Sequence, residues 1–124
     1  DVYKRQTNSQ PICQELSKRE NIQLTCSGGT LQRKYGCYVS PSLISQLKSL
    51  EIDLFIFSCE GIDSHGALWD SNTVNADFKS LLLKRAAQSL LLIDKSKFNR
   101  SGEASIGHLD DVTHILSDAQ IAAK

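Results

Sequence analysis

Apolar residues recur along this chain at two spacings, which together predict an alternation of helices and strands. Residues 22–26 alternate between apolar and polar side chains, which is typical of a half-buried strand. Residues 54–59 and 89–93 are almost continuously apolar, as expected of strands buried on both faces of a parallel sheet. A last strand is predicted over residues 112–116.

Three segments carry apolar residues three or four positions apart, as amphipathic helices do. The first begins near Pro11, and the second follows Ser40 and Pro41, since proline is tolerated in a first helical turn. The strongest runs from Thr73 to Gln88. Its predicted buried stripe is Val74, Phe78, Leu81, Leu82 and Ala86.

The remaining segments carry weaker signals. Residues 60–72 and 101–107 are expected to be connections, and residues 31–39 fit neither a helix nor a strand clearly. The predicted order is helix, strand, helix, strand, helix, strand, strand. It indicates the α/β class, with a mostly parallel sheet flanked by helices. A strand before Thr7 would complete the pattern, so we expect an N-terminally truncated domain.

Length and charge narrow the possible functions. The 124 residues suffice for one small domain, and 14 basic residues balance 14 acidic ones. A neutral domain lacks the positive surface with which proteins bind nucleic acid. No apolar run approaches the ~20 residues that a membrane-spanning helix needs. We therefore expect a cytoplasmic domain that does not itself contact DNA or membrane.

The four cysteines are Cys13, Cys26, Cys37 and Cys59. Their spacing is wide and no signal peptide precedes them, so reduced thiols in the cytoplasm are favoured over disulfides. Cys26 and Cys59 lie in apolar strand patterns, and we expect both to be small core residues.

The two ends of the chain look foreign or interrupted. Residues 1–6 read like the translated transposon end used in DNA library preparation, and we exclude them from the predicted fold. Residues 7–124 are interpreted as an interior piece of a longer protein.

Polar residues follow two of the predicted strands, and these are the candidate site. Gly61 and Asp63 come after residues 54–59, and Lys95 and Lys97 come after residues 89–93. Because one helix-length segment separates the two strands, a βαβ unit would bring these residues to one sheet edge. Such an edge suits a small anion, for example a sugar phosphate.

Other residues could join this site, each with a simpler alternative. The pair Gly28-Gly29 follows a strand and could offer backbone N–H groups to an anion, or form only a tight turn. Asp63 could bind sugar hydroxyls or stabilise its own loop as an Asx-turn. Lys79 opposes the helix macrodipole in the N-terminal half of its predicted helix, unless an anion binds nearby.

Two aromatic residues of the loop over residues 60–72 have favoured structural roles. Trp69 could stack on a sugar, but a partly buried anchor is the better interpretation. His65 is expected to be a polar loop residue. The histidines and cysteines show no metal-ligand spacing, and no Ser or Cys has an identifiable base. We expect no metal, no cofactor and no catalytic residue.

The motifs together resemble the C-terminal effector domain of DeoR-family bacterial transcription regulators. The carrying sequences are E-G-I-D at residues 60–63, G-A-L at 66–68 and L-L-L-I-D-K-S-K-F at 90–98. Thr7-Asn8-Ser9 and Ser27-Gly28-Gly29-Thr30 fit that family's T-N and G-G positions.

This resemblance implies a fold, a ligand and partners. The fold would be ribose-5-phosphate-isomerase-like (NagB/RpiA/CoA-transferase-like), and the ligand a phosphorylated sugar. A winged helix-turn-helix elsewhere in the protein would bind operator DNA, and the regulator would be a homo-oligomer. The effector-binding residues implied are Asn8, Gly28, Gly29, Gly61, Asp63, Lys79 and Lys97.

Two other functions share the fold. A sugar-phosphate isomerase would need a carboxylate base. The base's position falls near Lys79, a cation, which leaves only Glu60. A module that only mediates oligomerisation is the third possibility. The sensor is the favoured interpretation. Polar turns are predicted to lie together at one sheet edge, where they could bind a ligand, but the sequence offers no base and nucleophile for catalysis.

Overall fold

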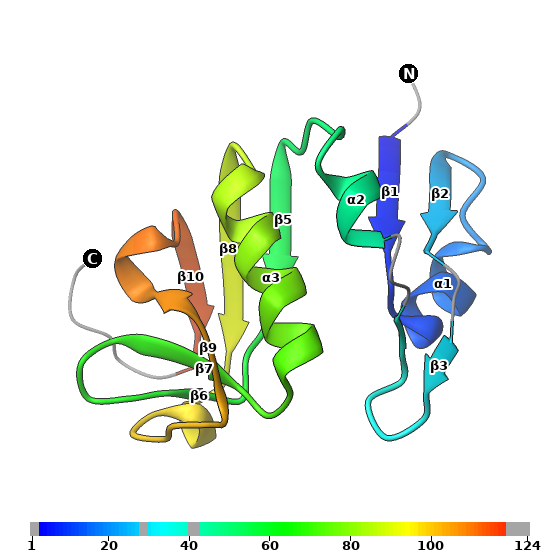
Figure 1. The fold of residues 1–124 in the computed structure, drawn as a ribbon. Coiled ribbons are helices and arrows are strands. Elements are labelled where there is room, and N and C mark those ends of the chain that lie inside the picture. The colour runs from blue at the N-terminus through cyan, green and yellow to red at the C-terminus, as the bar shows by residue number, and fades with distance from the viewer. Residues whose placement is uncertain (1–2, 28–29, 40–42, 119–124) are drawn as a thin grey trace. The chain divides into compact units, whose positions relative to one another are not determined.

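The computed structural model describes residues 3–27, 30–39 and 43–118 and divides the chain into two compact units (Figure 1). The first unit is Asp1–Leu47 and the second is Lys48–Lys124.

The first unit is built around a pair of parallel strands. Strands β1 and β2 pair in parallel, with Thr7 opposite Cys26, and helix α1 connects them. Strands β3 and β4 form an antiparallel hairpin. The elements are β1 (Tyr3–Thr7), α1 (Gln10–Leu16), β2 (Ile22–Cys26), β3 (Thr30–Gln32), β4 (Cys37–Val39) and α2 (Leu43–Leu47).

Local sequence explains both α1 and the hairpin. The Ser9 hydroxyl accepts a hydrogen bond from the Ile12 amide, and Pro11 lies in the first turn, which confirms the helix predicted there. Residues 31–39 were ambiguous because their strands are only three residues long. Gly36 closes the turn between them at φ +65°, a conformation that favours glycine. The predicted caps Ser40 and Pro41 lie outside the described residues.

Two expectations about the first unit need correction. Residues 3–6, left out of the predicted fold, pair with β2 as part of β1. Their origin as an adapter sequence stays a prediction. Cys13 and Cys26 form a disulfide, and Cys26 is exposed, so neither the reduced pair nor a core position for Cys26 was right. Cys37 and Cys59 are buried thiols, as expected of Cys59.

The second unit combines a parallel and an antiparallel sheet. The parallel sheet has the order β10-β8-β5, and the antiparallel sheet has the order β6-β7-β9. The elements are β5 (Leu54–Phe57), β6 (Gly61–Ile62), β7 (Ala67–Asp70), α3 (Thr73–Arg85), β8 (Gln88–Ile93), the 3-10 turn η1 (Lys95–Lys97), β9 (Ala104–His108), the 3-10 turn η2 (Leu109–Asp111) and β10 (His114–Ser117).

The βαβ unit predicted from the sequence is confirmed. Strand β5 pairs in parallel with β8, and α3 lies between them along the chain. The carboxyl ends of both strands therefore lie on the same side of this sheet, with residues 58–60 after one and η1 after the other.

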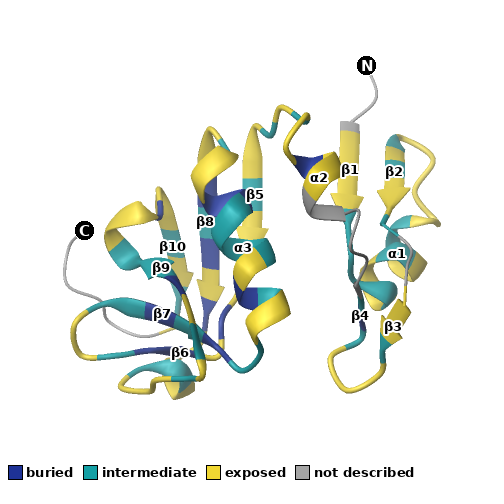
Figure 2. Ribbon diagram, in the orientation of Figure 1, coloured by how far each residue is buried: buried dark blue, intermediate teal, exposed yellow. Residues whose placement is uncertain are grey.

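One hydrophobic core holds this unit together, and its members come from three layers. Phe57, Leu91 and Ile93 belong to the parallel sheet, α3 adds Ala76 and Leu83, and the antiparallel sheet adds further apolar residues. Figure 2 shows the buried stretch of β8 beside α3. Leu68, Leu91 and Val112 are the largest fully buried side chains.

The opposite face of the parallel sheet is exposed, contrary to the prediction of burial on both faces. Leu54, Ile56, Leu92 and Leu116 are between 39% and 64% exposed. They alternate along the strands with the core residues Phe57 and Leu91. A continuous apolar run does not reveal which faces are covered, and here only alternate residues pack inward.

The antiparallel sheet was missed because its strands are short and carry glycine. Residues 60–72, expected to be a loop, contain β6 and β7, and residues 101–107 contain most of β9. Helix α3 is confirmed but ends at Arg85. Its buried residues are Ala76, Leu82 and Leu83, whereas Val74 is half exposed. Among the described residues, no helix is long and apolar enough to cross a membrane.

Candidate functional site

Two lysines contact the chain segment that follows β5. The Lys79 ammonium from α3 donates to the Ser58 carbonyl at 2.8 Å. The Lys97 ammonium from η1 lies 3.5 Å from the Glu60 carboxylate. Both cations therefore contact residues 58–60, at the sheet edge where the sequence predicted an anion site.

Lys79 is also paired inside the protein. Its Nζ lies 2.9 Å from Asp70 Oδ2, and the side chains are 23% and 6% exposed. That oxygen has no hydrogen-bond partner among the described residues, so the ion pair with Lys79 is its compensation. Asp70 is therefore the anion that compensates Lys79, which lies at the middle of α3 and not in its N-terminal half as expected for a longer helix. Sequence analysis missed it, although a carboxylate nine positions before Lys79, just ahead of the helix cap, was the available signal.

The pair between Lys97 and Glu60 is of a different kind. The two side chains are 29% and 48% exposed, and their closest charged atoms are 3.5 Å apart. Surface pairs of this sort contribute roughly 0–1 kcal/mol to stability. Lys97 can therefore exchange Glu60 for a stronger anion at small cost.

The turn that carries Lys97 is fixed by Asp94. Asp94 Oδ1 accepts hydrogen bonds from the amide and the hydroxyl of Ser96, and these bonds lower the pKa of the Asp94 carboxyl. The Lys95 amide donates to Asp118 Oδ1 at 2.7 Å. Two carboxylates thus constrain the turn η1, which carries Lys97.

Gly61 has a packing reason to be glycine. A Cβ on Gly61 would lie 2.5 Å from the Arg100 carbonyl oxygen, which belongs to the backbone and cannot swing away. The next residue bridges to Phe98, directly after Lys97. The structure therefore brings Gly61 and Lys97 together, with glycine permitting the close approach of the two chain segments.

Asp63 lies in a stable turn of its own. Asp63 Oδ1 accepts from the amides of His65 and Ala67, and Oδ2 accepts from the Trp69 indole at 3.0 Å. The indole bond is the largest cause of a lowered pKa of the Asp63 carboxyl, followed by the Ala67 amide. This geometry matches the Asx-turn alternative. Both oxygens are engaged, so a ligand would compete with three existing hydrogen bonds.

The two aromatic predictions in this loop are confirmed. Trp69 is partly buried and anchored by its indole N–H, and His65 is an exposed loop residue. The His65 carbonyl lies 2.7 Å from Nε2 of His108. Because Nδ1 of His108 accepts from the Asp110 amide, Nε2 carries the proton and donates.

Cys59 is the middle residue of the segment at residues 58–60. It is 5% exposed, its thiol donates to the Gly61 carbonyl, and burial raises its pKa. The thiol is therefore protonated at neutral pH and is a poor nucleophile.

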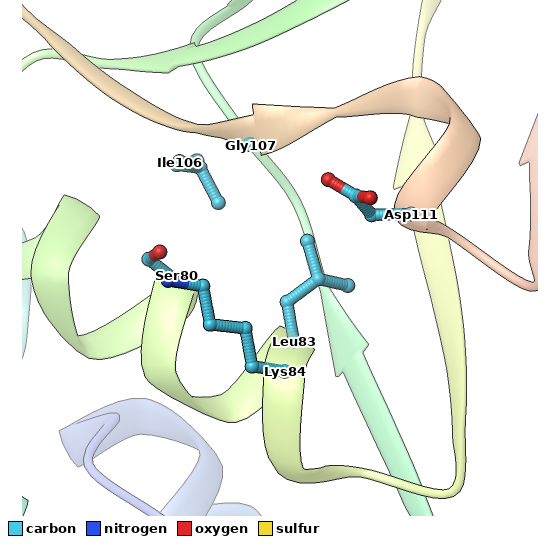
Figure 3. Close-up of a pocket in the computed structure, with 6 residues that line it drawn as sticks. All are labelled: Ser80, Leu83, Lys84, Ile106, Gly107 and Asp111. Atoms are coloured by element: carbon cyan, nitrogen blue, oxygen red, sulfur yellow. The ribbon is translucent and has the colours of Figure 1, made fainter.

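A cavity of about 230 Å³ opens between α3 and β9 (Figure 3). Its lining includes the apolar Leu83 and Ile106 and the charged Lys84 and Asp111. The cavity shares no lining residue with the segment at residues 58–60 and holds one charge of each sign.

The three candidate residues of the first unit are only partly described. Asn8 Nδ2 donates to the Tyr38 carbonyl at 3.4 Å, and Asn8 directly follows β1. Gly28 and Gly29 lie outside the described residues. Within the described ranges, no three His, Cys, Asp or Glu side chains gather as a metal site would require.

An α/β unit with polar groups at the carboxyl ends of parallel strands is the architecture of many small-molecule binding domains. The sequence profile of the DeoR C terminal sensor domain matches residues 4–119, and the chain belongs to this family. The resemblance noted from the motifs is thereby confirmed.

Individual relatives agree with the family. The chain is 83% identical to the L-fucose operon activator of Escherichia coli strain K12, over 94% of this chain and 48% of that protein. It is 32% identical to the protein of the same name from Haemophilus influenzae, over 93% and 46%. The glycerol-3-phosphate regulon repressor of E. coli matches at 24% identity, over 91% and 45%.

The chain thus spans about half the length of the curated relatives it matches. The family and these relatives are transcription regulators and not enzymes. The isomerase alternative has no support from them, and the structure adds that Lys79 is an ion-paired cation where a carboxylate base was needed.

Proposed function

We propose that this chain is the effector-binding part of a regulator of L-fucose utilisation, and that its effector is L-fuculose 1-phosphate. The names of the relatives support the operon, and the family supports a sensor. The observation that carries the ligand class is the convergence of Lys79 and Lys97 on residues 58–60. Two ammonium groups at one sheet edge favour a phosphate ester over a neutral sugar.

The two lysines have different roles in this proposal. Lys79 keeps its pair with Asp70 and fixes the Ser58 carbonyl, so it shapes the edge of the site. Lys97 leaves Glu60 and binds the phosphate, because its present pair is long and partly exposed. Gly61 lets the two chain segments approach closely enough for Lys97 to reach the ligand.

The remaining contacts would come from other predicted residues. Gly28 and Gly29 would offer backbone N–H groups, and Asn8 its side-chain amide, whose bond to Tyr38 is long at 3.4 Å. Asp63 would act mainly by holding its loop, since its oxygens are already engaged.

The proposed sensor acts as part of a larger protein. Effector binding shifts the regulator between two states with different affinity for operator DNA, which a winged helix-turn-helix domain elsewhere in the protein contacts. We place this homo-oligomeric regulator in the cytoplasm, where sugar phosphates form. We assign the effector domain the ribose-5-phosphate-isomerase-like fold on the basis of its α/β character and its family.

The test is a thermal-shift titration of the full chain with L-fuculose 1-phosphate, L-fucose and inorganic phosphate. A ligand at 100 times its Kd adds about 2.7 kcal/mol to the stability, so the sugar phosphate should raise Tm by several degrees. Free L-fucose should raise it far less. Equal shifts for the phosphorylated and the free sugar would refute the phosphate site.

A matched pair of variants locates the site. Lys97→Gln removes the cation that faces Glu60, whereas Lys95→Gln removes an exposed cation of the same turn. We expect Lys97→Gln to weaken the affinity for L-fuculose 1-phosphate about tenfold, as one charge-assisted hydrogen bond would, and Lys95→Gln to leave it nearly unchanged. Equal losses in both variants would show a general charge effect instead.

A further inference from the structure

Cys13 and Cys26 lie where a disulfide can form without rearrangement of the backbone. Cys13 is in α1 and Cys26 is the last residue of β2, and their Cα atoms are 6.0 Å apart. This separation is within the commonest range for disulfides. The ladder between β1 and β2 and the hydrogen bonds of α1 hold the two positions in place.

The pair is also accessible, in contrast to the other two cysteines. Cys26 is exposed and Cys13 partly so, whereas Cys37 and Cys59 are 9% and 5% exposed. A small thiol or disulfide in solution can therefore reach Cys26 but not the buried thiols. Reactivity in this chain is concentrated at one pair.

The location of the pair matters for the proposed effector site. Cys26 is opposite Thr7 in the parallel ladder, and the Ser27 amide donates to the Thr7 carbonyl at 3.0 Å. Asn8 follows Thr7 directly, and residues 28–29 follow Ser27. Cys26 thus pairs with the residue before Asn8 and stands two positions before Gly28 in the sequence.

We propose that Cys13 and Cys26 are a redox-sensitive pair, and that its oxidation fixes α1 to the end of β2 and alters effector affinity. The second half of this proposal rests on the proposed function. Cytoplasmic disulfides are usually transient and redox-sensing, which is why a bridge at an exposed pair in such a protein points to regulation rather than to a permanent staple.

The chemistry is thiol–disulfide exchange with a small disulfide such as oxidised glutathione. The Cys26 thiolate attacks one sulfur of that disulfide and releases one glutathione thiolate, which takes up a proton. The Cys13 thiolate then attacks Cys26 Sγ and releases the second. Two protein thiols are oxidised, one glutathione disulfide is reduced, and the reverse exchange reopens the pair.

The first experiment equilibrates the full chain in glutathione buffers of increasing oxidation and then alkylates it for peptide mass spectrometry. We expect Cys13 and Cys26 to become linked as the buffer grows more oxidising, and the Tm to rise by roughly 5–10 °C, because the closed loop spans a sequence separation of 13. Cys26→Ser should abolish the shift, and Cys13→Ser is the second test of the same bond.

Cys37→Ala is the matched control, since it removes a buried thiol outside the pair. It should lower the baseline Tm but keep the redox-dependent shift. The proposal fails if oxidation links other cysteines, if Tm does not change on linkage, or if the shift survives Cys26→Ser and Cys13→Ser.

A second experiment separates the redox pair from the proposed function. The oxidised and reduced chains are each titrated with L-fuculose 1-phosphate, and we expect affinities that differ at least about threefold. If both forms bind equally, the coupling is refuted while the sensor stands. If neither form binds although the redox-dependent Tm is observed, the proposed function fails and the redox pair remains.

Discussion

The two units of this chain are stabilised by different means. The second unit has a continuous core that includes Phe57, Leu68 and Leu91. Among the residues of the first unit whose burial the structure describes, only Cys37 and Leu47 are buried hydrophobics. That unit depends on the β1–β2 ladder, to which the Cys13–Cys26 disulfide adds a covalent link in the oxidised form. Packing holds one unit, and backbone pairing holds the other.

This difference indicates which of the two units could respond to a ligand or to oxidation. A packed core tolerates little displacement, so the second unit is suited to hold charges in fixed positions. A unit with few buried side chains opens at lower free energy and can respond to a ligand or to oxidation. The predictions below test that contrast, beginning with the largest effect.

The core of the second unit should be sensitive to the loss of a single side chain. Leu91 is fully buried, so Leu91→Ala should lower the free energy of unfolding by about 3 kcal/mol. Its neighbour Leu92 is 39% exposed, and Leu92→Ala should cost less than ~1 kcal/mol. Urea unfolding followed by tryptophan fluorescence measures both.

The corresponding change in the first unit sharpens the contrast. Leu24 is only partly buried in β2, so Leu24→Ala should destabilise the chain less than Leu91→Ala does. An equal loss of stability at both positions would show that packing stabilises the two units to a similar extent. That result would contradict the proposed difference between them.

The buried ion pair gives the next effect in size. Lys79→Met leaves the carboxylate of Asp70 buried without its cation, which should cost about 2–4 kcal/mol. Replacing both partners, as in Lys79→Met with Asp70→Leu, should recover part of that loss. A double variant that is no more stable than Lys79→Met alone would show that the lost stability does not come from an uncompensated charge.

Gly61→Ala should destabilise the second unit by about 1–3 kcal/mol, since its Cβ would press on a backbone carbonyl. Gly107→Ala is the matched control. Its nearest neighbours, at 3.1 and 3.3 Å, are the side chains of Asp111 and Leu83, which can move. Chemical denaturation of both variants measures the two changes in unfolding free energy. A smaller loss of stability for Gly61→Ala than for Gly107→Ala would contradict the close approach of the two chain segments at Gly61.

The smallest effect is a pH dependence at Asp63. Its pKa is lowered in the folded state, so the stability it contributes is present above the unfolded pKa and is lost as pH falls through the folded pKa. The Tm difference between the protein and Asp63→Asn should be constant above about pH 5 and shrink below pH 4.

Trp69→Phe tests the cause of that shift. It removes the indole N–H that bonds Asp63 but keeps an aromatic ring. The folded pKa of Asp63 should then lie closer to its unfolded value, so less stability should be lost on acidification than in the unmodified protein. An unchanged acid profile would assign the lowered pKa to the backbone amides alone.

Much of the fold was readable from the sequence, wherever local pattern and tertiary packing agree. Helix α3 has an Asn72 cap and enough length to show its period, and β8 is a strongly apolar run. Strands β6, β7 and β9 were missed because two to five residues carry too little pattern, and because β9 pairs with β7, which is far away in the chain. The exposed face of β5 was misjudged because an apolar run does not show which side is covered.

The candidate site was predictable as a place but not as a set of contacts. The strand ends identified Lys97 and Gly61, since parallel strands deliver their following residues to one edge. The partners could not be foreseen. Asp70 reaches Lys79 only through the fold of β7 against α3, and the reason for Gly61 is a carbonyl from residue 100. The disulfide was judged from the cellular compartment, which says nothing about two Cα atoms 6.0 Å apart.

The contacts of Lys79 limit how many bonds an incoming anion can receive from it. An ammonium group has three N–H bonds; Lys79 donates one to the Ser58 carbonyl, and its charge is compensated by Asp70 2.9 Å away. At most two N–H bonds are left for any guest. A phosphate, with three oxygens to satisfy, must therefore collect most of its donors elsewhere, and its fit will depend on the geometry of several partners rather than on the strength of one.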